Sequence, residues 1–242
     1  MIQPTQHRFI FDNVTLRGRG RLRLDEACGS IPSSGITVLV GPSGSGKSTL
    51  LRCCNRLEVP SAGRVLFSGN DVAALDPLKL RRRVGMVFQR PTPFPGTVRE
   101  NLQVAEPSIT DVTATSTLAQ VGLNPEFLDR VATDLSGGEA QRVCLARTLV
   151  TNPEVVLMDE VTSSVDSAQR FGLEALARSL SSSGVGVVWV THDLVQMRRV
   201  ADHVLVVVNG RIAHQGPVSE VDTEAPESVR AFLSGETPQE SS

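Results

Sequence analysis

The sequence of 242 residues is poor in the residue types that mark several classes of protein. It contains no tyrosine, one tryptophan and four cysteines. These cysteines (Cys28, Cys53, Cys54 and Cys144) show no C-x-x-C spacing, which argues against a zinc site and against a disulfide framework. We therefore expect a protein that works in a reducing compartment.

Long apolar runs and blocks of basic charge are also missing. No stretch approaches the about 18 consecutive apolar residues of a membrane-spanning helix, and residues 1–7 lack the apolar core of a signal peptide. We expect that the chain itself does not cross a membrane. The net charge is -2 with a pI of about 6.1, and the largest basic block is residues 81–83. This charge pattern predicts no nucleic-acid partner.

The sequence does contain a glycine-rich loop in a specific context. Residues 41–48 fit the pattern G-x-x-x-x-G-K-[ST], and they follow the apolar run 36–40. A buried strand, a glycine loop and a helix start predict a phosphate cradle, because the backbone can wrap closely around an anion and point N–H groups at it. The residues expected to contact the nucleotide are Gly41, Pro42, Ser43, Gly44, Ser45, Gly46, Lys47, Ser48 and Thr49.

Two side chains of this loop carry specific roles. Lys47 should reach the β- and γ-phosphates, and the Ser48 hydroxyl should bind Mg²⁺. The sequence therefore predicts a protein that binds a nucleoside triphosphate.

The hydrophobic periodicity predicts alternating strands and helices. The helix after the loop should run from Lys47 to about Leu57, with Leu57 on its apolar face. Other expected helices cover residues 76–83, 97–104, 111–121 and 125–130, one opened by residues 135–142, and a terminal helix near 217–233. The expected strands are residues 9–16, 36–40, 64–67, 84–88, 155–158, 185–190, 204–208 and 212–215.

Four arginines alternate with other residues near the N-terminus. Arg17, Arg19, Arg21 and Arg23 recur with the period of a strand. Such a row could bind an anionic ligand, but a solvated strand face is the commoner origin of the pattern. We assign it to an outer antiparallel strand.

A proline-rich loop follows the strand at residues 84–88. Gln89 comes first, and the three prolines of residues 90–96 stiffen the segment and exclude a helix. A polar side chain is thus held at the end of a strand, next to a loop that could serve as a hinge. Phe94 projects from this loop and has two interpretations: an exposed docking residue, or a core residue beneath the helices that follow.

The segment from Leu135 to Arg142 opens a helix. Ser136 with Glu139 three residues later fits a capping box, while Gly137 and Gly138 leave N–H groups open to an anion. From the residues alone, both interpretations stay open.

Acidic residues follow the buried strand at residues 155–158. The carboxyl ends of parallel strands share one edge of a sheet, and the phosphate loop leaves its strand at that edge. We therefore expect Asp159 to bind Mg²⁺ and Glu160 to act on an attacking water, although acidic residues are also common at loop starts. By the same argument His192, after the strand at 185–190, should contact the γ-phosphate, unless it is a satisfied core histidine.

In this order, the motifs resemble the ATP-binding subunit of an ATP-binding cassette (ABC) transporter over residues 9–233. The resemblance implies an α/β fold: a P-loop NTPase core with a mainly parallel sheet, an N-terminal antiparallel β piece and an inserted small helical subdomain. One ABC ATPase domain would cover residues 1–242. Its core would lie at about 8–88 and 140–233, its helical subdomain at about 90–139, and a polar tail at 235–242.

The resemblance also implies the chemistry and its residues. ATP and Mg²⁺ would be the cofactors, and the chain would hydrolyse ATP. The catalytic residues would be Lys47, Gln89, Glu160 and His192, with Ser48, Gln89 and Asp159 at the metal. Subunits would pair head to tail, with a homodimer as the expected form, so that Ser136, Gly137 and Gly138 bind the partner's γ-phosphate. Asp166 would be a further nucleotide-binding residue.

The implied partners are a second ATPase subunit and transmembrane permease subunits, with a substrate-binding protein as a further candidate. The implied location is the cytoplasmic face of the cell membrane, as a peripheral protein. Soluble ABC ATPases of DNA repair or translation are the alternative from another class. They usually carry a coiled-coil insertion or two fused cassettes, and neither fits in this length.

The sequence departs from the family pattern at several positions. Val161 stands where proline is usual, Ser164 and Val165 stand where Ala-Leu is usual, and Glu139 replaces a common glutamine. The larger departure is the missing adenine-stacking aromatic, because the expected position falls near Arg17. We therefore expect weak nucleobase selectivity.

The cargo is less well marked than the ATPase. Residues 85–95 are similar to phosphate-importer ATPases, whereas residues 159–163 and 188–193 are similar to a short-subunit group linked to metal-ion export. We expect an inorganic phosphate importer, with a metal-ion exporter as the alternative.

Overall fold

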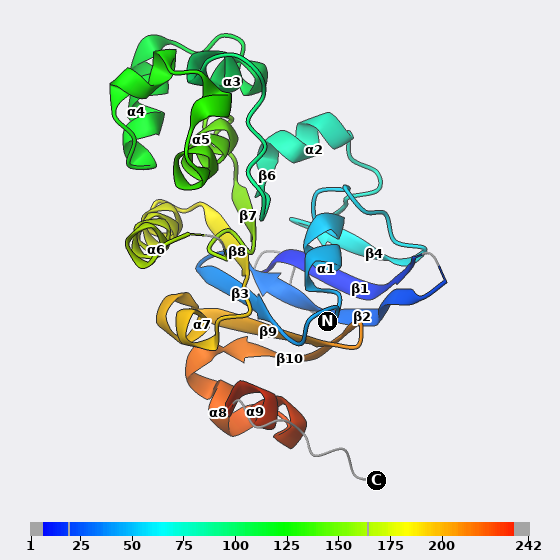
Figure 1. The fold of residues 1–242 in the computed structure, drawn as a ribbon. Helices are drawn as coiled ribbons and strands as arrows, with labels where there is room; N and C mark the ends of the chain where they lie inside the picture. The colour runs from blue at the N-terminus through cyan, green and yellow to red at the C-terminus, as the bar shows by residue number, and fades with distance from the viewer. Residues whose placement is uncertain (1–6, 19, 164, 235–242) are drawn as a thin grey trace. The chain divides into compact units, whose positions relative to one another are not determined.

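The computed structural model describes residues 7–18, 20–163 and 165–234 (Figure 1). The chain forms two compact units. The first unit combines the residues up to Leu80 with those from Val188 onward, and the second unit is residues 81–187. Helix α2 (Pro77–Arg83) and strand β8 (Gly186–Val190) each run across one of these boundaries.

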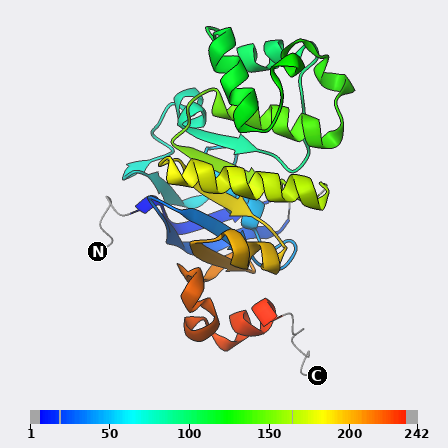
Figure 2. The same cartoon turned by 90° about the vertical axis from the view of Figure 1, so that its left-hand side faces the viewer.

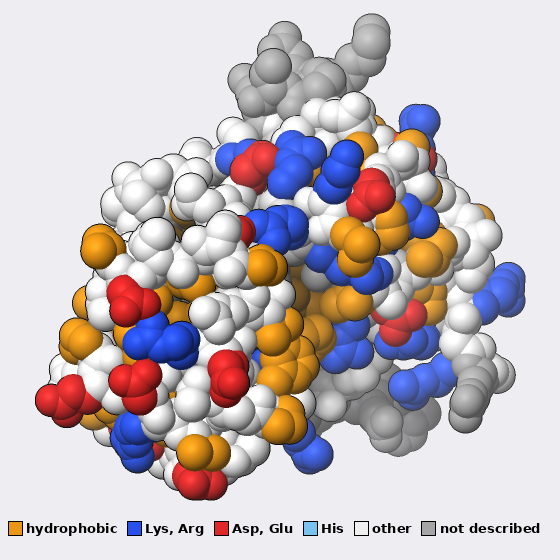
Figure 3. All heavy atoms as spheres, turned by 90° about the horizontal axis from the view of Figure 1, so that it is seen from above, with side chains coloured by type: hydrophobic (Ala, Val, Ile, Leu, Met, Phe, Trp, Pro, Cys, Tyr) orange, Lys and Arg blue, Asp and Glu red, His pale blue; other side chains and the backbone are white. Residues whose placement is uncertain are grey.

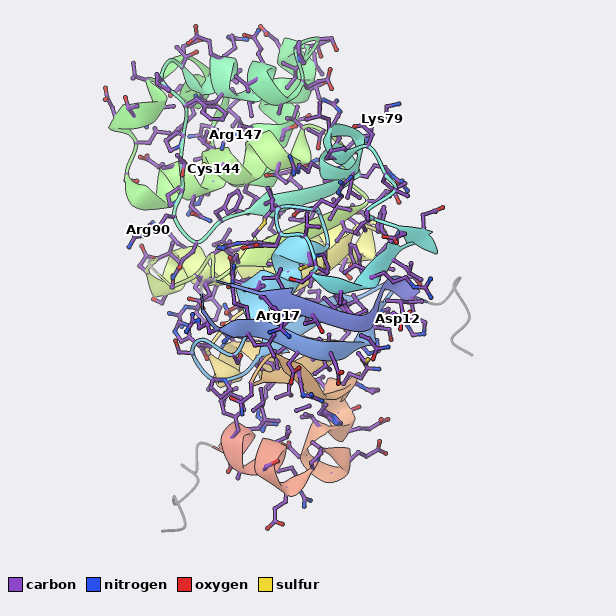
Figure 4. All side chains as sticks on the ribbon, turned by 90° about the vertical axis from the view of Figure 1, so that its right-hand side faces the viewer. Asp12, Arg17, Lys79, Arg90, Cys144 and Arg147 are labelled. Carbon is purple, nitrogen blue, oxygen red and sulfur yellow. The ribbon has the colours of Figure 1, made fainter. Side chains whose placement is uncertain are left out.

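The first unit contains an antiparallel sheet of four strands. They are β1 (His7–Arg17), β2 (Leu22–Pro32), β4 (Ala62–Phe67) and β5 (Asn70–Asp71), in the order β2-β1-β4-β5. Phe9 and Phe67 pair across β1 and β4 with ring centroids 5.1 Å apart, and on the other face Arg64 Nε lies 2.9 Å from Asp12 Oδ2 (Figure 4). The predicted N-terminal antiparallel β piece is thus confirmed.

The sequence predicted one outer strand for the arginine row. The structure differs, because the row does not form a continuous strand. The backbone N–H of Gly18 donates to the carbonyl of Arg21 at 2.8 Å, so a turn separates β1 from β2. Arg17 therefore ends one strand, while Arg23 lies on the next.

The same unit holds the strands that lead to and flank the phosphate loop. Strand β3 (Ile36–Val40) is buried throughout and pairs in parallel with β9 (His203–Val208), and β10 (Arg211–Pro217) pairs antiparallel with β9. Helix α7 (Leu194–Val200) packs against β3. These pairs form part of a mixed sheet, which together with the covering helices gives the predicted α/β class.

Helix α1 (Lys47–Cys53) is shorter than predicted. The N–H of Cys54 turns back to the carbonyl of Leu51 at 3.1 Å, and Arg56 adopts a left-handed backbone with φ of 56°. Leu57 is 41% exposed and does not belong to the apolar face of the helix. The prediction of a helix to Leu57 was wrong because spacing alone does not reveal where a chain turns.

The predicted terminal helix near 217–233 is broken into short pieces. They are a 3₁₀ turn η3 (Val218–Glu220), α8 (Val221–Glu224) and α9 (Glu227–Ser234). Ala225 is extended (φ −68°, ψ 148°), as expected of a residue before a proline, so Pro226 interrupts the helix. The polar tail at 235–242 lies outside the described residues.

The second unit pairs β6 (Val84–Val87) in parallel with β7 (Val155–Asp159). Its helices are α3 (Val98–Ala105), α4 (Asp111–Gln120), α5 (Gly137–Leu149) and α6 (Ser167–Ser182). Short 3₁₀ turns η1 (Pro125–Asp129) and η2 (Ala132–Asp134) lie between α4 and α5. Helices α3 and α4 pack on α5 (Figure 2). The helices predicted between residues 97 and 121 are confirmed, and the one predicted at 125–130 is a 3₁₀ turn.

The predicted bounds of the core and of the helical subdomain stay predictions, since the two compact units divide the chain at other positions. Within the part of the chain that the structure describes, no helix has both the length and the apolar character needed to cross a bilayer.

Candidate nucleotide site

Two glycines shape the phosphate loop between β3 and α1. Gly41 has φ of 147°, and a side chain there would overlap the carbonyl oxygen of Val207. Gly46 caps α1 with φ of 108°, and a Cβ at this position would lie 2.7 Å from the Arg23 carbonyl oxygen. Both positions therefore need glycine for their backbone conformation and for the close approach of another segment.

Lys47 is held by the loop itself. Its Nζ donates to the carbonyl oxygens of Gly41 and Pro42, each at 2.9 Å, and the residue is only 6% exposed. A buried ammonium needs such acceptors, since an unpaired charge in the interior is costly. Oxygens of a phosphate could take the place of these carbonyls.

Ser45 gives a direct test of whether an anion fits the loop. Its backbone is fixed, because its N–H donates to the Pro42 carbonyl at 3.2 Å and its carbonyl accepts from the Gly210 N–H at 2.8 Å. Its Oγ is buried and has no hydrogen-bond partner among the described residues. A buried hydroxyl without a partner costs free energy, so an acceptor oxygen from a ligand would satisfy it.

His192 follows β8 in the first unit and is exposed, so it is not a core histidine. Its neighbour Thr191 donates its N–H to the Leu39 carbonyl of β3 at 3.3 Å. Asp193 caps α7 by accepting from the Gln196 N–H at 2.9 Å. The contact of His192 with a γ-phosphate stays a prediction.

The second unit brings together the residues predicted around the attacking water. Gln89 Nε2 donates to Glu160 Oε2 at 3.0 Å and to Ser163 Oγ at 3.3 Å, and Ser163 Oγ donates to the Glu160 carbonyl at 2.9 Å. Asp159 ends β7 and is 3% exposed, while Glu160 next to it is more accessible. The adjacent carboxyl groups thus have different surroundings.

Ser136 and Glu139 form the capping box of α5. The Ser136 Oγ accepts from the Glu139 N–H at 3.4 Å, and the Ser136 N–H donates to Glu139 Oε2 at 2.9 Å. Hydrogen bonds from the Ser136 N–H and hydroxyl, aided by Arg130, hold the pKa of the Glu139 carboxyl below its ordinary value. The capping interpretation is confirmed, and it leaves the anion interpretation untested.

The two glycines after Ser136 differ in their surroundings. A Cβ at Gly137 would meet no atom within 4 Å, whereas one at Gly138 would overlap the side-chain amide of Gln169. Gln169 lies on α6, where its N–H donates at 2.8 Å to the capping carboxylate of Asp166. Asp166 thus has a structural role at the start of α6. Ser164 of the same loop lies outside the described residues.

Phe94 combines both interpretations that the sequence left open. It is 42% exposed, and the Arg147 guanidinium carbon lies 4.2 Å from the centre of its ring. Fully buried Asn101 fixes its backbone, accepting from the Phe94 N–H at 2.7 Å and donating to the Phe94 carbonyl at 2.9 Å. Sequence reasoning missed Asn101 and Arg147, which is labelled on α5 in Figure 4, because no local pattern connects them to Phe94.

Arg23 is a further residue that sequence reasoning missed. It was predicted on a solvated strand face, but its Nη2 donates to Thr49 Oγ1 at 2.8 Å and its Nη1 to Glu58 Oε1 at 2.8 Å. The arginine is therefore half-buried against the first turn of α1.

The candidate metal ligands are all oxygen donors: the Ser48 hydroxyl, the Gln89 amide and the Asp159 carboxylate. Among the described residues, no group of three or more His, Cys, Asp or Glu side chains could hold a metal ion by itself. This donor chemistry fits Mg²⁺, which often takes one or two carboxylates and completes its shell with phosphate and water oxygens.

Charge is mixed on the face shown in Figure 3. Basic, acidic and hydrophobic side chains are interspersed there, without a continuous basic field. This view agrees with the absence of a long basic block from the sequence.

Comparison with known proteins gives consistent matches. The family model described as ABC transporter matches residues 24–163. "Protein STAR1" of Oryza sativa subsp. japonica is 40% identical over 232 residues, which cover 90% of this chain and 67% of that protein. "Phosphate import ATP-binding protein PstB 2" of Mycobacterium tuberculosis is 37% identical over 230 residues, 86% of this chain and 81% of that protein.

A solved structure matches as well. It is cbiO1 from Clostridium perfringens, described as part of the ABC transporter complex cbiONQ. The TM-score is 0.80 at 26% identity, over 90% of this chain and 92% of that one.

Proposed function

The chain belongs to the ABC transporter family as an ATP-binding, ATP-hydrolysing subunit, and from this premise we propose that the transporter it powers imports inorganic phosphate. Two observations support this cargo: the similarity of residues 85–95 to phosphate-importer ATPases, and the relative named as a phosphate import protein, which is 37% identical over 86% of this chain.

The observation that carries the ATPase chemistry is the phosphate loop with its buried lysine. On binding ATP, Lys47 would exchange the Gly41 and Pro42 carbonyls for oxygens of the β- and γ-phosphates, and Ser45 would gain an acceptor. The ammonium then neutralises charge that grows on the phosphate as the bond to its leaving oxygen breaks. His192 is proposed to contact the γ-phosphate.

Glu160 is proposed to polarise the attacking water. One of its carboxylate oxygens accepts a hydrogen bond from the Gln89 amide. Gln89 can therefore orient Glu160 and respond when the hydrogen bonds of Glu160 change. Ser48, Gln89 and Asp159 would hold Mg²⁺. When bound, the ion would neutralise the β- and γ-phosphates and orient them.

We further propose that two chains pair head to tail on ATP. The open space at Gly137 would receive the partner's γ-phosphate, with Ser136 and Gly138 beside it, and Asp166 is proposed as a further nucleotide-binding residue. The loop carrying Phe94 is proposed to contact a transmembrane permease, which would keep this subunit at the cytoplasmic face of the membrane. A substrate-binding protein would deliver the phosphate.

Transport by the complete complex tests the cargo. The chain is purified with its permease, reconstituted in liposomes, and supplied with the matching substrate-binding protein. Uptake of radiolabelled phosphate should require ATP on the side of the ATPase, and Glu160→Gln in the same complex should abolish it. Outward movement of a divalent metal ion without phosphate uptake would overturn the phosphate assignment and keep the ATPase.

Phe94→Ala tests the proposed permease contact. Aromatic anchors often supply much of the binding energy of an interface, so the variant should assemble more weakly with the permease while the isolated subunit hydrolyses ATP normally. A lower melting temperature with unchanged assembly would instead assign Phe94 to the core.

A further inference from the structure

Arg23 contacts the phosphate loop region through both its side chain and its backbone. The guanidinium bridges Thr49 Oγ1 and Glu58 Oε1, with both distances at 2.8 Å. The Arg23 carbonyl oxygen lies against Gly46, the residue that caps α1. Its aliphatic stem passes over Gly18, where a Cβ would come within 2.7 Å of Arg23 Cδ. Arg23 thus links the β1–β2 hairpin to the start of α1.

Arg23 brings a positive charge to the first turn of α1. Its guanidinium donates to Thr49, which belongs to that turn. Glu58 supplies one negative charge beside Arg23, while buried Lys47 adds a second positive charge at the same helix start. An anion bound at the loop would be attracted by both cations.

The hydrogen bond from Arg23 determines which part of the Thr49 hydroxyl is left for a ligand. Its Oγ accepts the hydrogen bond from Arg23, so the hydroxyl proton is the part of the group that can be donated onward. Thr49 is 6% exposed, which limits the acceptors that can reach it. A phosphate oxygen in the loop is the acceptor with suitable charge.

We propose that Arg23 is a positioning and affinity residue for the triphosphate. It fixes the Thr49 hydroxyl and adds positive charge beside the loop, and so it strengthens the binding of the phosphates. The proposal rests on the ATPase activity and is independent of the phosphate cargo.

Steady-state hydrolysis by the full chain tests this proposal. Arg23→Ala should raise KM for ATP about tenfold, with the effect on KM rather than on kcat, because a charge-assisted hydrogen bond near the phosphates is lost. Arg23→Lys should fall in between, since an ammonium keeps the charge but cannot form the planar bridge. Arg21→Ala is the matched control, because it removes the same charge from an exposed position on the same hairpin and should leave KM unchanged.

Two further measurements separate positioning from mere support of the fold. If Arg23 acts through Thr49, Arg23→Ala combined with Thr49→Val should raise KM no further than the larger single change. Inorganic tripolyphosphate should also compete about tenfold less well in Arg23→Ala, because the contact is made to phosphate and not to the base.

Specific results would overturn the proposal. They are a lower melting temperature of Arg23→Ala with unchanged KM, or an equal rise of KM in Arg21→Ala. If the unmodified chain hydrolyses no ATP, the ATPase assignment fails instead, and calorimetric binding of ATP to the same variants still decides the role of Arg23.

Discussion

The two units hold their functional side chains in different ways. In the first unit, Lys47 is buried and donates to carbonyls five and six residues away in the same loop. In the second unit, Gln89 and Glu160 meet across 71 residues of sequence, and their contact is exposed. The phosphate loop therefore has its conformation before a ligand binds. Gln89 and Glu160 are joined instead by a hydrogen bond that a ligand could replace. We therefore expect ATP binding and ATP hydrolysis to respond separately to mutation.

The largest effect is expected from a change to Lys47 in the phosphate loop. Lys47→Ala removes the charge that neutralises the β- and γ-phosphates, so affinity for ATP should fall by about a hundredfold or more. Isothermal calorimetry measures this directly. Lys79→Ala, which changes an exposed lysine on α2 (Figure 4), is the control and should bind normally. Near-normal affinity in Lys47→Ala would refute the assignment of the loop.

Glu160→Gln should stop ATP hydrolysis without loss of ATP binding, which would separate the roles of the two units. The amide cannot take up a proton from water, so kcat should fall by about a hundredfold to a thousandfold while calorimetric affinity for ATP stays within a few fold. Normal hydrolysis by this variant would remove Glu160 from the attack on the γ-phosphate.

The same variant tests the head-to-tail pair. With ATP and Mg²⁺, Glu160→Gln should shift from monomer toward dimer in light scattering, because the uncleaved nucleotide joins two chains. Adding Ser136→Arg should prevent the shift by filling the space for the γ-phosphate. A monomer under all conditions would count against the pair.

A smaller effect is expected from the capping box of α5. Ser136→Ala should cost about 1 kcal/mol in the free energy of unfolding, since an N-cap hydrogen bond is lost. The lowered pKa of Glu139 means that its stabilising contribution is complete above the ordinary glutamate pKa and is lost as pH falls through the lowered value.

Urea unfolding between pH 7 and pH 3 measures this dependence. Glu139→Gln should flatten it, while the exposed control Glu126→Gln should leave it unchanged. The same acid loss of stability in Glu139→Gln would show that other carboxyl groups account for it.

The smallest effect concerns the nucleobase. With no tyrosine to stack on the purine, ATP and GTP should differ in KM by less than about threefold, since phosphate contacts do not read the base. Arg17 is exposed at the end of β1 (Figure 4) and could stack instead. A strong preference for ATP that persists in Arg17→Ala would mean that another group reads adenine.

Local features were predictable from the sequence, and so was the strand edge that brings Gln89 to Glu160, but other contacts between distant residues were not. The phosphate loop and the capping box of α5 depend on residues within a few positions of each other, so their spacing carries the information. Arg23 meets Thr49 and Glu58 across 26 and 35 residues, and a period-two row of arginines does not show which member is half-buried. Leu57 illustrates a different limit, because helical spacing continued past the point where the backbone turned.

The burial of three cysteines has a practical consequence for labelling. Burial raises the pKa of the Cys53 thiol to about 12 and also raises the pKa of Cys54 and Cys144, whereas Cys28 lies exposed on β2. Thiol reagents react with the thiolate and need access to it. A maleimide dye should therefore attach to the native protein at Cys28 alone, which gives a fluorescent reporter on the antiparallel sheet without any substitution near the phosphate loop.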